Sequence, residues 1–174
     1  LTLLWSLLFL CLLKRRTVWV LVLVLSIGSV YVGSGPLGIN TPSRYLRGSF
    51  SGVATTDHFD VFFDSESLSE SSLARLLDEH EFRYAELTHK LGVEPSSRVA
   101  SYVYGDVEER ARMTGARYTS VAPVWLADPQ VHVTMDSFYD VFAHELAHVF
   151  SREFGLPVIR ASTSIGLVEG LAVA

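Results

Sequence analysis

Apolar positions recur along this chain with two spacings, and the change between them separates strands from helices. Short apolar runs bounded by polar residues predict strands over 58–64, 98–104, 117–126 and 130–135. Between the first two strands a stripe that repeats every three or four positions predicts a helix. Its members are Leu73, Leu76, Leu77, His80, Tyr84, Leu87 and Leu91. With a short helix starting near Asp106, this order predicts an α+β fold, a mixed sheet packed on helices.

A helix over 137–155 is mostly apolar but carries two imidazoles along one edge. Ser137 and Asp140 have the spacing of a capping box at its start. At about 100° per residue, His144 and His148 fall on one face, beside an apolar face that we expect to meet the core. That apolar face comprises Phe138, Phe142, Leu146, Val149 and Phe150.

The uncharged stretch 17–33 predicts a transmembrane helix. At about 1.5 Å per residue it is near the lower limit for crossing a hydrocarbon layer of about 30 Å. The basic residues at 14–16 are expected to stay cytoplasmic, which would make everything after the segment extracytoplasmic; a cleaved signal peptide is the alternative. We expect 1–13 to be the end of a preceding apolar or transmembrane segment, and 34–57, which contains Gly and Pro, to be a linker.

The part of the chain after residue 34 is acidic. It contains 11 basic and 19 acidic residues, a net charge of −8, which argues against a nucleic-acid partner because phosphate binding needs clustered positive charge. The single cysteine, Cys11, makes no internal disulfide and is interpreted as a small buried apolar residue. Because the 174 residues begin at Leu1 and stop within an apolar helical pattern, we expect 58–174 to be a domain that is incomplete at its C-terminus.

The motif that carries chemistry is His144-Glu145-x-x-His148. Residues four apart share one helix face, so both imidazoles can reach one zinc ion about 2 Å away. Glu145, beside the ligands, can take a proton from a water molecule that the metal polarises and return it to a leaving amine. We interpret two of the remaining histidines, His80 and His89, as a core-edge and a surface residue.

A catalytic zinc site needs three protein ligands and one open position. No histidine follows His148, so a third imidazole downstream is excluded in this sequence. The segment after Ser162 predicts another helix, and its one acid is Glu169 in an otherwise apolar stretch. A lone carboxylate on a buried helix is costly unless it is paired, protonated or bound to a metal, so Glu169 is the candidate for the third ligand.

His144-Glu145-x-x-His148 followed after twenty residues by Glu169-Gly170-x-Ala172 resembles the gluzincin, or peptidase MA-like, zinc metallopeptidases. The resemblance implies a zincin-like metallopeptidase domain over 58–174, with His144, His148 and Glu169 as zinc ligands and Glu145 as general base. It also implies that the strand at 130–135 lines the cleft and pairs with the substrate. His132 on that strand would then face the cleft; the alternative is a solvated residue on an edge strand.

The chain departs from the family pattern in two places. It has no Gly-x-Met-Glu-Asn motif, so an endopeptidase is favoured over an aminopeptidase. Val173 occupies the position where thermolysin-like members often carry an acid that orients a histidine. The Tyr or His that usually supports the oxyanion is expected beyond Ala174.

We therefore predict a membrane-anchored, extracytoplasmic zinc peptidase that acts on peptides or proteins. An alternative from another class is a catalytically inactive, zinc-containing domain that binds peptides or acts as a sensor. The intact Glu145 argues against it, since a structural zinc site needs no base and usually has four protein ligands. A second alternative is a structural membrane protein in which the histidines are incidental and zinc does not bind.

Overall fold

The computed structural model describes residues 17–33, 43–117 and 128–155, together with 5–6, 9, 122 and 169–170. These residues form an α+β fold with one mixed four-stranded sheet. The helices are α2 (Thr17–Gly33), α3 (Ser43–Ser49), α4 (Glu70–Leu91), α5 (Val107–Thr114) and α6 (Phe138–Ser151), followed by the 3-10 turn η1 (Arg152–Phe154). The strands are β1 (Gly52–Thr55), β2 (Phe59–Phe63), β3 (Val99–Tyr104) and β4 (Gln130–Thr134).

The strands lie in the sheet in the same order as in the chain, β1-β2-β3-β4. β1 runs antiparallel to β2, whereas β2 with β3 and β3 with β4 are parallel. The parallel pairs need long connections, and α4 and α5 occupy them. β4, which leads directly into α6, forms one edge of the sheet made by the described residues.

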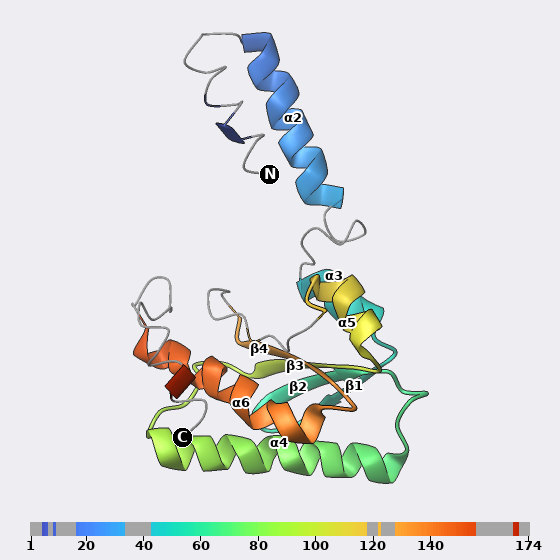
Figure 1. Ribbon diagram of the computed structural model, residues 1–174, viewed down its shortest axis with the longest axis vertical. Coiled ribbons are helices and arrows are strands. Elements are labelled where there is room, and N and C mark those ends of the chain that lie inside the picture. Colours follow the sequence, from blue (N-terminus) through green and yellow to red (C-terminus); the bar gives the residue numbers. More distant parts are fainter. Residues whose placement is uncertain are drawn as a thin grey trace.

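Helices cover both faces of the sheet, α4 and α6 on one and α3 and α5 on the other (Figure 1). Alternation along each strand separates two apolar clusters, because successive side chains point to opposite faces. Val99, Val103, Val131 and Val133 join the larger cluster with α4 and α6. Ala100, Tyr102 and Tyr104 join the smaller cluster, which Leu46 of α3 completes together with Phe62.

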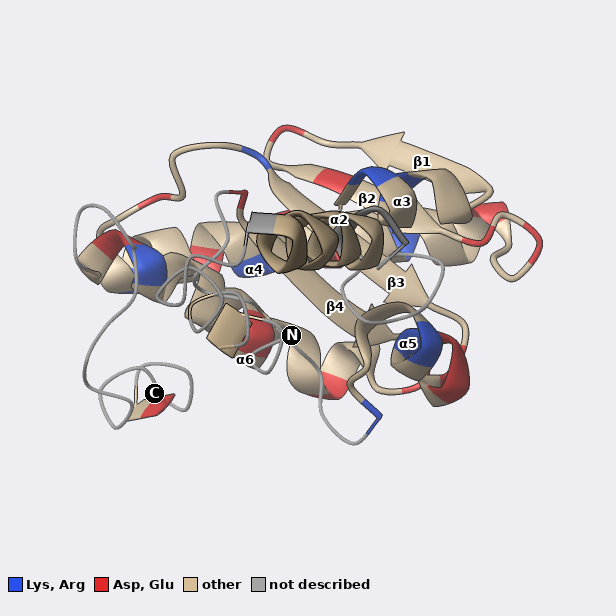
Figure 2. Ribbon diagram, turned by 90° about the horizontal axis from the view of Figure 1, so that it is seen from above, with Lys and Arg blue, Asp and Glu red and all other residues tan. Residues whose placement is uncertain are grey.

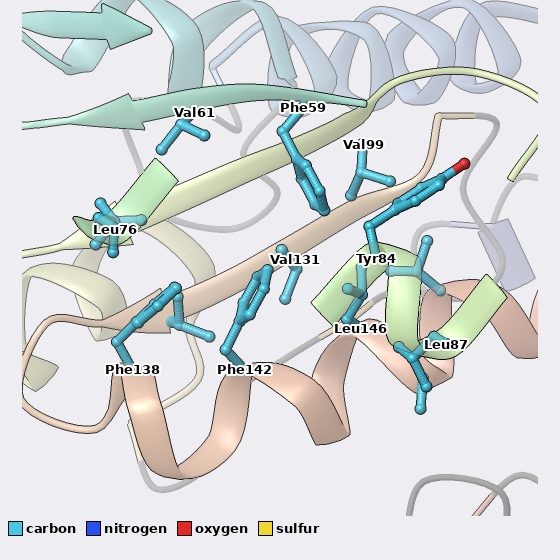
Figure 3. Packing of buried hydrophobic residues seen from close by; sticks show 14 of the residues in the cluster. Phe59, Val61, Leu76, Tyr84, Leu87, Val99, Val131, Phe138, Phe142 and Leu146 are labelled. Atoms are coloured by element: carbon cyan, nitrogen blue, oxygen red, sulfur yellow. The ribbon is translucent and has the colours of Figure 1, made fainter. Parts of the chain in front are cut away.

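The larger cluster is an aromatic core between the sheet and the helix pair α4/α6 (Figure 3). The Phe138 and Phe142 rings of α6 stack with centroids 4.7 Å apart, and Phe59 of β2 lies 6.0 Å from Phe142. Tyr84 of α4 meets Phe150 of α6 edge to face at 5.1 Å. These contacts fix how α6 is rotated about its own axis.

α4 confirms the helix predicted from the apolar stripe, and its capping residues explain where the helix begins and ends. The Ser69 side chain accepts a hydrogen bond from the Ser72 amide at the first turn. Gly92 ends the helix with a φ of 67°, a left-handed conformation that glycine adopts without steric cost.

α5 likewise starts where the sequence places it, with the Asp106 carboxylate accepting from the Glu109 amide at 2.7 Å. The strands predicted at 58–64, 98–104 and 130–135 are confirmed as β2, β3 and β4. The strand predicted over 117–126 lies outside the described residues, apart from Arg117 and Ala122.

Two ordered elements occupy the stretch 34–57 that was expected to be a linker. α3 packs on the sheet through Leu46, and β1 pairs with β2 from Gly52↔Phe63 to Thr55↔Asp60. The prediction was wrong for 43–55, whereas 34–42 lie outside the described residues. The four-residue strand GVAT carries too few positions to show a period, and α3 is stabilised mainly by contacts with distant strands.

The predicted transmembrane helix over 17–33 is also wrong. The stretch is helical and uncharged, as Figure 2 shows for α2, but its 17 residues span about 25 Å against a hydrocarbon layer of about 30 Å. Among the described residues, no helix combines the length and the apolar character needed to cross a membrane. The preceding segment 1–13 lies outside the described residues except for Trp5, Ser6 and Phe9.

Replacing Phe142 with alanine tests the core. The ring, which α6 packs against β2 and α4, is fully buried, so Phe142→Ala should lower the free energy of unfolding by about 3–5 kcal/mol. Phe154→Ala removes an equally large but exposed ring and should change stability by less than about 0.5 kcal/mol. Urea unfolding monitored by circular dichroism measures both; equal losses would contradict the packing of α6.

His80 should make stability depend on pH. The ring is fully buried, with Nδ1 donating to the Leu76 carbonyl at 2.7 Å and Nε2 accepting from the Ser101 hydroxyl at 2.8 Å. Burial lowers the pKa of His80 from 6.5 to about 4, so the unfolded chain takes up a proton at a higher pH than the folded one. Stability is therefore fully present above pH 6.5 and is lost as the pH falls toward 4, by about 3 kcal/mol.

Urea unfolding at several pH values measures this effect. His80→Gln should reduce the loss of stability between pH 6.5 and 4 without abolishing it, because burial also lowers the pKa of His132 to about 4. His89→Gln, at an exposed position of the same helix, should leave the loss as in the wild type. Identical pH profiles for His80→Gln and the wild type would show that His80 is not the source.

Candidate functional site

α6 presents the HExxH residues because its other face is anchored in the core. Phe138, Phe142, Leu146, Val149 and Phe150 are all buried, as the helical periodicity predicts. The predicted capping box is wrong: the Ser137 side chain makes no cap hydrogen bond and lies 2.8 Å from the Thr134 hydroxyl instead. The turn after β4 is therefore closed by side chains of the turn itself, and the orientation of α6 comes from its packing.

The two imidazoles on the opposite face of α6 converge on one point. The Nε2 atoms of His144 and His148 are 3.1 Å apart, and the ring planes are nearly perpendicular, at 88°. The side chain of His148 is 12% exposed and that of His144 is 36% exposed. Burial lowers the pKa of His148, which favours the neutral imidazole that binds metals.

The structure brings Glu169 to this pair from a segment far along the chain. Its Oε2 lies 3.8 Å from Nε2 of His144, and its Oε1 lies 3.8 Å from Nε2 of His148. Its side chain is 56% exposed, so the argument from the sequence that burial forces this carboxylate to have a partner does not hold. Its proximity to both imidazoles is the stronger evidence for a shared site.

The spacing of these three side chains fits a zinc ion. One ligand atom from each residue lies within 4.8 Å of the others, and among the described residues this is the one group of His, Cys, Asp and Glu with such a spacing. Two atoms bound at 2.0–2.1 Å to a tetrahedral ion are roughly 3.4 Å apart. The two Nε2 atoms are 3.1 Å apart, and each lies 3.8 Å from a different oxygen of the Glu169 carboxylate. Two imidazoles and one carboxylate are also a common catalytic zinc set.

Glu145 lies beside this group without belonging to it. The residue is 8% exposed, and burial raises the pKa of its carboxyl group. The negative charge of Glu169 adds to that rise, whereas the positive charges of His144 and Arg110 oppose it. A carboxyl group with a raised pKa binds a proton more readily than an exposed one and can release it again. This is the property that a proton carrier next to a metal site needs.

His132 does not face this site. In the β3–β4 pairing it lies opposite Tyr102, and its ring stacks on the Tyr102 ring at 4.8 Å on the sheet face away from α6. It is buried, its Nδ1 is 2.9 Å from the Tyr104 hydroxyl, and burial lowers its pKa to about 4. Both alternatives considered from the sequence, a cleft residue and a solvated one, are therefore wrong.

The sequence reasoning missed Arg110 on α5. It is buried, its guanidinium donates to the carbonyls of Ala116 and Arg117, and its charge acts on both His132 and Glu145. Arginine is rarely buried, and nothing in the pattern around Asp106 and Glu109 marks it, so the sequence carries no signal for this residue.

Several residues named from the sequence lie outside the described part of the chain. They include the helix start near Ser162, Ala172 of the second motif and Val173; Glu169 and Gly170 are described and helical. Comparisons with protein-family models, with curated proteins and with solved structures find no match for this chain. The interpretation of the site therefore rests on its own residues and geometry.

Removing one imidazole should remove the metal. We expect the wild type to bind one zinc per chain and His148→Ala to lose more than about 100-fold in affinity, because a direct ligand is worth more than the 10–100-fold of a supporting residue. His89→Ala, which changes an exposed histidine on α4, is the matched control. Elemental analysis after dialysis and calorimetric titration measure both; undiminished zinc in folded His148→Ala would contradict the site.

Proposed function

We propose that this protein is a zinc-dependent peptidase of the gluzincin type that cleaves peptide bonds within a chain. The observation that supports this proposal is the convergence of His144, His148 and Glu169, whose ligand atoms lie within 4.8 Å of one another. The carboxyl group of Glu145 interacts electrostatically with His144 and Glu169. A site that only stabilises the fold would need no base. The absence of a Gly-x-Met-Glu-Asn motif from the 174 residues favours internal cleavage.

In this mechanism His144, His148 and Glu169 hold the zinc ion. When bound, zinc supplies Lewis acidity that polarises the scissile carbonyl group. Glu145 accepts one proton from the attacking water molecule while the oxygen of that water bonds to the carbonyl carbon. It then delivers that proton to the amide nitrogen as the carbon–nitrogen bond breaks, so that one acid and one amine leave.

The surroundings of Glu145 suit this transfer. Its low exposure keeps bulk water from competing for the proton, and the packed core behind α6 keeps its backbone fixed during the reaction. Its pKa, raised by burial, is closer to neutrality than that of an exposed glutamate, which is the condition for efficient proton transfer in both directions.

Glu145→Gln separates catalysis from metal binding. Glutamine has nearly the same shape but cannot carry the proton, so hydrolysis should fall by about 100-fold or more while one zinc per chain remains. A library of peptides from unrelated proteins, with cleavage products read by mass spectrometry, measures the activity whatever the natural substrate is. Glu66→Gln, at an exposed turn, is the matched control and should behave as the wild type.

Full hydrolysis by Glu145→Gln would show that the mechanism is wrong. Zinc binding by the wild type without cleavage of any library peptide would instead favour a domain that binds peptides without cutting them.

A further inference from the structure

The three ligand residues are held in place by very different means. His144 and His148 project from one face of one packed helix, so the backbone of α6 keeps the two imidazoles side by side whenever that helix is folded, and their Nε2 atoms are 3.1 Å apart. The low exposure of His148 shows that its ring is also packed by its surroundings. We call His144 and His148 the half-site, because α6 alone positions these two of the three proposed ligands.

Glu169 is held much less firmly by the described part of the chain. Its carboxylate is more than half exposed, and both of its contacts with the imidazoles are 3.8 Å, too long for hydrogen bonds. Gly170 beside it is exposed, and a methyl group built at its Cα would meet nothing within 4 Å. An exposed ion pair with this geometry contributes little to stability.

We propose that coordination of zinc, rather than packing of the polypeptide, docks Glu169 on α6, so that metal binding and docking of this residue are one coupled event. The inference rests on the proposed zinc site and adds to it the order of assembly. A metal that binds only the assembled arrangement stabilises that arrangement by mass action. The two-histidine half on α6 receives the ion, and the carboxylate then completes the set of ligands.

This coupling has a consequence for regulation. With two ligands the half-site binds zinc weakly, and with three it binds tightly, so the docked form of Glu169 becomes more populated as free zinc rises. The fraction of molecules with all three ligands in place therefore rises with the zinc supply.

Hydrogen–deuterium exchange measured by mass spectrometry on the whole chain tests this proposal. With one equivalent of zinc, peptides that contain Glu169 and Gly170 should exchange about tenfold more slowly than in EDTA, since docking restricts opening of this backbone. Peptides from the middle of α6, which is packed in both states, should change by less than about twofold.

Glu169→Gln removes the charge and keeps the shape. It should bind zinc at least about tenfold more weakly and show no slowing of exchange at residues 169–170 when the half-site is saturated with zinc. Glu66→Gln should reproduce both wild-type results.

The failures are distinguishable. Equal exchange at 169–170 with and without zinc, in a protein that holds one zinc per chain, would overturn the proposal and leave the zinc site intact, because packing would then hold Glu169. Unchanged zinc affinity in Glu169→Gln would also overturn it. A wild type that binds no zinc would overturn both the proposal and the function on which it rests.

Discussion

The packing of the aromatic stripe of α6 against the sheet and α4 is the constraint on which the rest of the candidate site depends. Phe138 and Phe142 lie within the core, and this fixes the rotation of the helix about its axis. Once that rotation is set, His144 and His148 share one face of α6, away from the core. A rigid hydrophobic contact thereby positions polar chemistry, as rigid scaffolds do for most functional sites.

The sequence predicted those features of the fold that depend on local pattern. α4 and α6 carry apolar stripes long enough to show a helical period, and the Gly92 and Asp106 caps act within a few residues. It failed for α3 and β1, whose stability comes from Leu46 and from pairing with β2. The transmembrane prediction for 17–33 failed because it relied on the apolar character of the stretch, although a helix of 17 residues is too short to cross a membrane.

The candidate site divides in the same way. The spacing within His144-Glu145-x-x-His148 is helical geometry, and a sequence displays it directly. The approach of Glu169 to the two imidazoles is a tertiary contact. The resemblance to a known pair of motifs predicted this contact, whereas the argument from burial did not hold because the Glu169 side chain is 56% exposed. His132 lies on the same sheet face as Tyr102, its partner in the β3–β4 register. The sequence QVHVT does not reveal this face, because all five of its residues are buried. No local sequence pattern indicates that Arg110 is buried, because its burial depends on residues that are near it in space.

The sheet order β1-β2-β3-β4 matches the chain order, and this has a consequence for how the protein is made. As the chain leaves the ribosome, β2, β3 and β4 each have a pairing partner that precedes them in the chain. α6 follows all four described strands in the chain. The two imidazoles therefore reach the folding chain only after every described strand has been made, and the core closes when the helix that carries them packs on the sheet.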